Sequence, residues 1–118
     1  MLGSGTQQDP YLIETPTDLD NIRNDLTAYY ELANDIDYGN SEWTEINSSA
    51  FTGVLDGKDY TIKNVLLTDK KFIGTIENAE IKNITFDNFT IKGYYFATYL
   101  VNSTLDNVSF KNTDLETT

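Results

Sequence analysis

Apolar and polar residues alternate in short stretches along the second half of the chain, and asparagine or glycine separates the stretches. Residues 84–86 read ITF and residues 108–110 read VSF. Such alternation predicts β-strands with one buried face. Asparagine and glycine tolerate left-handed backbone, which tight turns require. The pattern therefore predicts several short strands joined by tight corners.

The pattern returns after 24 residues. Residues 72–91 align on residues 96–115 without a gap. A period of this length with several short strands fits one coil of a parallel β-helix. Leucine-rich repeats have a similar period, but their leucine-dense strand and helical return are missing here. The matched positions include Phe72 with Phe96, Ile76 with Leu100, Ile84 with Val108, and Asn83 with Asn107.

An earlier copy of the repeat is predicted to begin at Phe51. Residues 51–57 align on residues 72–78 at an offset of 21. After a two-residue insertion, residues 62–65 align with residues 81–84. This alignment stacks Asn64, Asn83 and Asn107 at one corner, where side-chain amides can satisfy backbone groups of the turn.

The residues before the repeat predict a cap. Thr15 has the character of an N-cap and Pro16 suits the first helical position. Leu19, Ile22 and Leu26 follow at helical spacing, so we expect a short helix over about residues 16–26. A strand over residues 29–32 and an acidic turn over residues 34–37 follow. We expect Trp43 and Ile46 to complete the cap. We predict one domain, residues 1–118, with an N-terminal cap (1–50) and three coils (51–118).

Several segments together resemble the start of GLUG-type repeat proteins, which are β-helical modules of bacterial surface adhesins, secreted proteins and phage tail or virion proteins. The resemblance implies a right-handed parallel β-helix and a surface or virion role, and it carries no catalytic residues. The last copy departs from the pattern, because Ala97 and Thr98 replace Ile73 and Gly74. The segments that carry the resemblance are residues 3–13, 32–37, 43–46, 51–57 and 72–78.

Charge is concentrated in the first half of the chain. The formal charge is −11, from 8 basic and 19 acidic residues. Residues 1–57 contribute −10 and residues 58–118 contribute −1. The acidity argues against direct nucleic-acid binding, and no apolar run approaches the roughly 18 residues of a membrane span. The start lacks the pattern of a signal peptide.

Two missing residue types limit the chemistry. The chain has no cysteine and no histidine, which excludes thiolate zinc sites and the usual general base. Asn34, Asp35, Asp37 and Asn40 could supply oxygen ligands to Ca²⁺, but they lack a full calcium-loop pattern. We therefore expect no metal and no cofactor.

Acidic residues of the first half form a candidate docking patch, whose alternative is an ordinary solvated face. Its members are Asp35, Asp37, Glu42 and Glu45. For a saccharide-cleaving enzyme, Glu42 with Glu45, or Asp56 with Asp59, would be the carboxylate pair.

Tyrosines of the last copy form the candidate binding site. The 24-residue register assigns Tyr94, Tyr95 and Tyr99 to the slots of Lys70, Lys71 and Thr75. Aromatic residues that replace lysines suggest a contact surface, and the alternative is local packing of the rings at a corner. No second cap follows the last copy, so we also expect an exposed coil edge.

These observations predict a non-enzymatic structural and binding module of a phage virion or a bacterial surface. Its partner would be a protein or a surface glycan, and self-association through the open C-terminal coil is one route. The alternative is a small acidic, phage-encoded inhibitor that mimics DNA and acts on a host nuclease or CRISPR-type complex in the host cytoplasm. A polysaccharide-cleaving enzyme is the third class.

Overall fold

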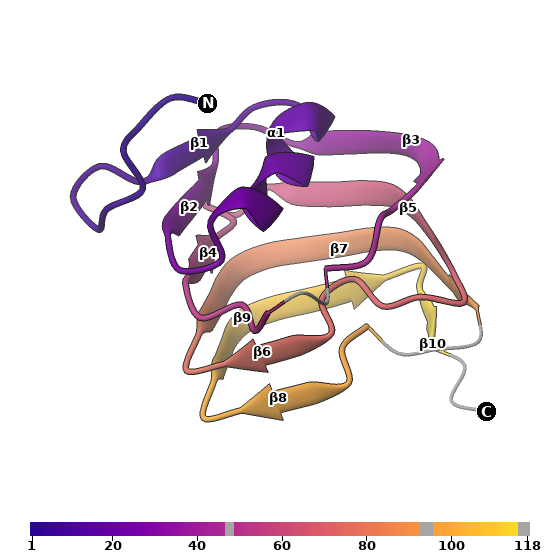
Figure 1. Ribbon diagram of the computed structural model, residues 1–118. Helices are drawn as coiled ribbons and strands as arrows, with labels where there is room; N and C mark the ends of the chain where they lie inside the picture. The colour runs from indigo at the N-terminus through magenta and orange to yellow at the C-terminus, as the bar shows by residue number, and fades with distance from the viewer. Residues whose placement is uncertain (47–48, 93–95, 116–118) are drawn as a thin grey trace.

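The computed structural model describes residues 1–46, 49–92 and 96–115. The chain forms a parallel β-solenoid of about three turns, with one short helical stretch near its N-terminus (Figure 1). The predicted fold class is therefore confirmed. The helical stretch comprises α1 (Pro16–Asp20) and the 3₁₀ helix η1 (Asn21–Asn24). The strands are β1 (Tyr11–Ile13), β2 (Tyr29–Leu32), β3 (Ile36–Glu42), β4 (Val54–Asp56), β5 (Thr61–Thr68), β6 (Thr75–Glu77), β7 (Glu80–Lys92), β8 (Tyr99–Val101), β9 (Thr104–Lys111) and β10 (Asp114–Leu115).

The strands line three sides of the solenoid, and all pairs of these strands are parallel. The first side contains β1, β2, β4 and the N-terminal parts of β7 and β9. The second contains β3, β5 and the later parts of β7 and β9, with β10 beside β7. The third contains β6 and β8, and single bridges extend it to Ile46 and Phe51.

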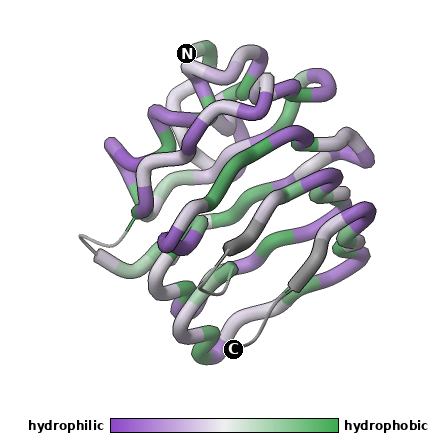
Figure 2. The backbone as a smooth tube through the Cα atoms, turned by 90° about the vertical axis from the view of Figure 1, so that its right-hand side faces the viewer, coloured by the Kyte–Doolittle hydropathy of each residue, from purple (hydrophilic) through white to green (hydrophobic). Residues whose placement is uncertain are grey.

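Corner asparagines decide which side chains point inward. In β7 the buried residues Ile81, Ile84, Phe86 and Phe89 are spaced by three, two and three residues. The three-residue steps contain Asn83 and Asn88, whose φ values are 53° and 55°. A left-handed residue turns the chain and resets the alternation, so each new stretch again presents apolar residues to the core. Figure 2 shows the resulting alternation of hydrophobic and hydrophilic segments along the coils.

The predicted register of the first copy is wrong by four residues at Phe51 and by five residues in β4 and β5. The structure pairs Ile62 with Phe86, and Asn64 Oδ1 accepts its hydrogen bond from Asn88 Nδ2 and not from Asn83. Phe51 bridges to Ile76, not to Phe72. The two segments share a local F-x-G motif, but ladder hydrogen bonds fix the stacking. The corner between β4 and β5 holds two residues more than the equivalent corner of β7, so the offset falls from 26 to 24 residues across it.

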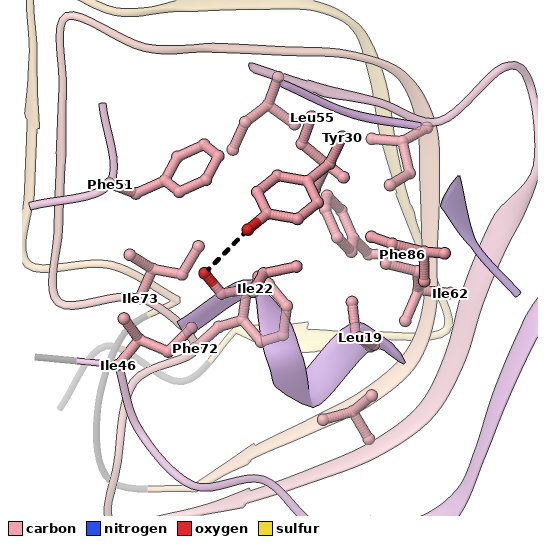
Figure 3. Packing of buried hydrophobic residues seen from close by; sticks show 14 of the residues in the cluster. Leu19, Ile22, Tyr30, Ile46, Phe51, Leu55, Ile62, Phe72, Ile73 and Phe86 are labelled. Carbon is pink, nitrogen blue, oxygen red and sulfur yellow. Dashed lines mark hydrogen bonds between the residues drawn. The ribbon is translucent and has the colours of Figure 1, made fainter. Parts of the chain in front are cut away.

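The helical stretch covers the first end of the core, as predicted. Thr15 Oγ1 accepts a hydrogen bond from the backbone N–H of Asp18 at 3.1 Å, which confirms the N-cap. Leu19 and Ile22 are buried beneath the helix (Figure 3). The Tyr30 hydroxyl donates to the carbonyl of Ile22 at 3.4 Å, which ties the helix to β2 (Figure 3). Helical structure ends at residue 24, two residues earlier than expected.

Aromatic rings form a column through the core. The rings of Trp43 and Phe72 have centroids 4.5 Å apart, and those of Phe72 and Phe96 are stacked 5.1 Å apart. A second stacked pair, Phe86 and Phe110, has centroids 5.2 Å apart. The predicted stacking of Phe72 on Phe96 is therefore confirmed, and Trp43 occupies the position above Phe72 that the sequence had assigned to Phe51.

Candidate functional site

The four acidic residues of the predicted patch connect the first coil to the second. They lie in β3 or beside it. Three of them accept a hydrogen bond from a residue of the next coil, and the fourth forms an ion pair with a lysine of that coil. These residues therefore have a structural task, and their use as a docking patch stays a prediction. The contacts are Asp35 Oδ1 with Thr61 N (2.9 Å), Asp37 Oδ1 with Asn64 Nδ2 (2.9 Å), Glu42 Oε2 with Lys70 Nζ (2.9 Å) and Glu45 Oε1 with Lys71 N (2.6 Å).

Two of these carboxylates are held in the charged form. The pKa of Asp37 is lowered because Asn64 Nδ2 and then the backbone N–H of Gly39 donate to it. The pKa of Glu42 is lowered by its hydrogen bond from Lys70, assisted by Thr68. Donors favour the ionised carboxylate because they stabilise its negative charge.

The oxygen-rich segment around Asp35 is occupied by local hydrogen bonds. Asn34 Nδ2 donates to the carbonyl of Glu14 at 3.0 Å. Asp35 and Asp37 accept the inter-coil bonds given above, and Asn40 has left-handed backbone with a φ of 61°. Within the described residues, no three acidic side chains gather as metal ligands.

Asp56, one of the carboxylates considered for a saccharide-cleaving enzyme, also accepts hydrogen bonds from other residues of the fold. Asp56 Oδ1 accepts from the backbone N–H of Lys58 at 2.9 Å and from Asn83 Nδ2 at 3.4 Å. Asp59 occupies the same turn with a φ of 67°. Asp56 thus organises the corner after β4.

The predicted tyrosine site is described in part. Tyr94 and Tyr95 lie outside the described residues. Tyr99 lies in β8 directly opposite Thr75, as the 24-residue register requires, and it is 62% exposed. Tyr99 therefore points its ring outward, and its role as a contact residue stays a prediction.

The far end of the solenoid exposes apolar side chains that continue the core columns. Leu100, Leu105 and Phe110 are 50%, 46% and 39% exposed. They stand below Ile76, Ile81 and Phe86, which are buried in the preceding coil. The expected exposed coil edge is therefore present in the described chain, and we call this surface the open end.

A shallow groove on the first side was not foreseen from the sequence. It has a volume of about 190 Å³ and combines two tyrosines with acidic and basic groups. The sequence signal that could have indicated this groove is the alternation in β2. There Tyr29 and Glu31 point outward on either side of the buried Tyr30. Residues lining it include Gln7, Pro10, Tyr29, Glu31, Asp56 and Lys82.

Two much longer proteins share sequence with this chain. The chain is 36% identical over 109 residues to the "Putative Gly-rich membrane protein" of Evansella cellulosilytica, in a match covering 77% of the chain and 13% of that protein. It is 34% identical over 107 residues to halomucin of Haloquadratum walsbyi, covering 77% of the chain and 1% of halomucin. The chain thus spans a small fraction of the length of these relatives.

The other comparisons give no match. No family model matches the chain, so its resemblance to GLUG-type repeats stays a prediction. No solved structure matches it either. No helix in the described residues is long and apolar enough to span a membrane.

Proposed function

We propose that this chain is a non-enzymatic structural module of a cell-surface protein, in which a rigid β-solenoid holds outward side chains in fixed rows for assembly or attachment. The observation that carries the proposal is its similarity to short stretches of two very long proteins, one named as a membrane protein and the other as halomucin. A parallel β-solenoid suits this task because its coils stack with regular spacing.

The packing supports a rigid display. Continuous parallel pairing joins β5, β7 and β9 from one coil to the next. The aromatic column of Trp43, Phe72 and Phe96 runs along the same direction inside the core. Outward residues on such a frame keep their mutual distances, which lowers the entropy cost of binding to a repetitive surface.

Surface exposure on cells tests this proposal. An antibody raised against the recombinant chain is applied to intact and to permeabilised cells of the source organism. We expect labelling of intact cells that external trypsin removes, while an internal control protein resists the trypsin. Labelling only after permeabilisation would overturn the surface role and would favour the acidic inhibitor.

Tyr99 supplies a test of the display itself. Replacing it with threonine, the residue found opposite it at position 75, is expected to leave the melting temperature unchanged, because the ring is largely exposed. Binding of the recombinant chain to intact cells should fall if the third-coil tyrosines form the contact surface. A Thr98→Ser change beside it is the control. Unfolding of the Tyr99→Thr chain would show instead that the ring is part of the core.

A further inference from the structure

Four asparagines with described surroundings stand two residues before a threonine or a serine. With no proline between them, this N-x-S/T pattern is the acceptor motif for N-linked glycosylation. A fifth copy of the motif, residues 47–49, lies partly outside the described residues. The sequence does not rank the copies, whereas the hydrogen bonds of the fold do. The four motifs are Asn83-Ile84-Thr85, Asn88-Phe89-Thr90, Asn102-Ser103-Thr104 and Asn107-Val108-Ser109.

Three of the four amides already connect one coil to the coil before it. In each of them, the Nδ2 group donates to a side-chain oxygen of the preceding coil. Glycosylation places a sugar on Nδ2, so a sugar on these nitrogens would be crowded against that coil. The bonds are Asn83 Nδ2 to Asp56 Oδ1 (3.4 Å), Asn88 Nδ2 to Asn64 Oδ1 (2.8 Å) and Asn107 Nδ2 to Asn83 Oδ1 (3.1 Å).

The amide of Asn102 is not engaged in this way. Asn102 lies at the corner between β8 and β9 (Figure 1), where it is exposed and has left-handed backbone with a φ of 48°. Among the described residues, none forms a hydrogen bond with its side chain. An asparagine amide carries two N–H donors on Nδ2, and both are therefore open to solvent here.

The backbone on either side of this amide is held in place by the preceding coil. Ser103 Oγ accepts a hydrogen bond from the backbone N–H of Ala79 at 3.2 Å, and the backbone N–H of Thr104 donates to the carbonyl of Ala79 at 3.0 Å. Thr104 is itself exposed. The motif therefore presents an accessible amide and an accessible threonine on a fixed corner.

The same corner is also exposed in the preceding coil, which has a further coil packed beside it. Asn78 occupies the equivalent position between β6 and β7, the strands that pair with β8 and β9. It is exposed, its φ is 51°, and no described residue hydrogen-bonds to its side chain. Exposure is thus a property of this corner. Asn78 lacks the motif, because Glu80 stands where a threonine or serine is required.

We propose that Asn102 is an N-glycosylation site. Its Nδ2 attacks C1 of a sugar carried on a diphosphate, and the bond from C1 to the diphosphate oxygen breaks. The diphosphate leaves with that electron pair, while Nδ2 releases one proton to solvent and keeps the other. The donor is a glycosyl diphosphate supplied by the cell. The inference rests on the surface location proposed above, because the motif is an acceptor in secreted chains.

Mass spectrometry of the chain from its own cells tests this site. Intact cells are treated with a biotin reagent that does not cross membranes, and the chain is recovered with the antibody and separated into biotinylated and unlabelled fractions. Trypsin cleaves after lysine, so it separates residues 83–92, which carry the first two motifs, from residues 93–111, which carry the last two. We expect biotinylated chain in which peptide 93–111 is heavier by whole sugar residues, placed on Asn102 by fragmentation, and peptide 83–92 has its sequence mass.

Two matched variants expressed in the same cells test the motif. Thr104→Val removes the hydroxyl and keeps the branched shape, so the sugar on Asn102 should be lost. Thr85→Val makes the same change in the motif of Asn83, and the sugar on Asn102 should remain. Circular dichroism of the recombinant variants checks that both chains fold.

A third variant tests the corner by gain of a sugar. Glu80→Thr gives Asn78 the complete motif at the equivalent corner. We expect a second sugar, on Asn78, because this amide is as exposed and as free as that of Asn102. Absence of the second sugar from a folded variant would show that an exposed corner amide is not sufficient, and the structural basis of the proposal would be wrong.

The biotin label separates failure of this site from failure of the surface role. Biotinylated chain without a sugar on Asn102 would overturn the site and leave the proposed function standing. A sugar on Asn102 of chain that the reagent never reaches would support the site and overturn the surface location, and unmodified chain found only inside cells would overturn both. Equal occupancy of Asn102 and the three asparagines that connect coils would overturn the selection by hydrogen bonding.

Discussion

Asparagine is the residue that shapes each coil. Eleven non-glycine residues in the described part of the chain have positive φ, and eight of them are asparagines. Left-handed backbone costs an ordinary residue roughly 1–2 kcal/mol, whereas asparagine adopts it more readily because its short side chain bonds locally. Five of these asparagines also donate their Nδ2 group to a side chain of the preceding coil, so one residue type provides both the corner and a connection between coils.

Asn64 allows these two roles to be separated. Its φ is 62°, and its side chain bonds to both Asp37 and Asn88. We expect Asn64→Gly to destabilise the chain by about 1 kcal/mol through loss of exposed hydrogen bonds, and Asn64→Ala by about 2 kcal/mol, because alanine adds backbone strain. Urea unfolding measures both. Equal losses would show that the backbone conformation contributes nothing.

The bond from Asn64 to Asp37 also predicts a pH dependence. The pKa of Asp37 is lowered in the folded chain, so its contribution is present above the ordinary carboxyl pKa of about 4 and is lost as pH falls through the folded pKa. Asn64→Gly should therefore reduce the loss of stability between pH 7 and pH 3. Asn88→Gly, which removes a bond to an amide and not to a carboxylate, should leave the pH dependence as in the parent chain.

At the scale of elements, the start of the helix can be tested separately from the rest of the cap. Thr15 Oγ1 satisfies the backbone N–H of Asp18, and Leu19 buries its side chain one residue later. We expect Thr15→Ala to cost about 1 kcal/mol, the usual value for loss of an N-cap. Thr17→Ala, at an exposed position of the same turn, is the control and should cost little. Thermal unfolding compares the two; similar losses would remove the special role of Thr15.

The elements themselves could be predicted because local chemistry specifies them. Alternation around Phe86 and Phe110 predicted strands, a gapless 24-residue repeat predicted their stacking, and Thr15 with Pro16 predicted the helix start. The register of the first coil could not be predicted this way. A shared F-x-G motif placed Phe51 on Phe72, but backbone pairing and the size of Trp43 decide which residues stack.

The candidate site was less predictable for a related reason. Sequence shows that Asp37 and Glu42 are acidic, but not that each meets a donor 27 or 28 residues later. Their charges look available to a partner until the coils are stacked. The bonds between asparagines of successive coils, such as the one from Asn88 Nδ2 to Asn64 Oδ1, likewise exist only once the coils are stacked.

For the whole molecule, stability depends on position along the solenoid. Each coil contacts only its neighbours, so an inner coil is supported on both faces and the last coil on one. The helical stretch covers the N-terminal end of the solenoid. Burial decreases toward the open end, where Leu105 and Phe110 are exposed. We therefore expect local opening to begin at β8 and β9 and global unfolding to involve the aromatic column.

Two phenylalanines of this chain test that expectation. Phe72 is fully buried and contacts Trp43 on one side and Phe96 on the other. Phe110 is 39% exposed, and its ring contacts are with Phe86 and Phe96 of earlier parts of the chain. Phe72→Ala should cost about 3–5 kcal/mol, as for other buried phenylalanines. Phe110→Ala should cost clearly less in urea unfolding, and it should accelerate amide exchange in β9 without affecting β5. If the two substitutions cost the same, the open end is covered in solution.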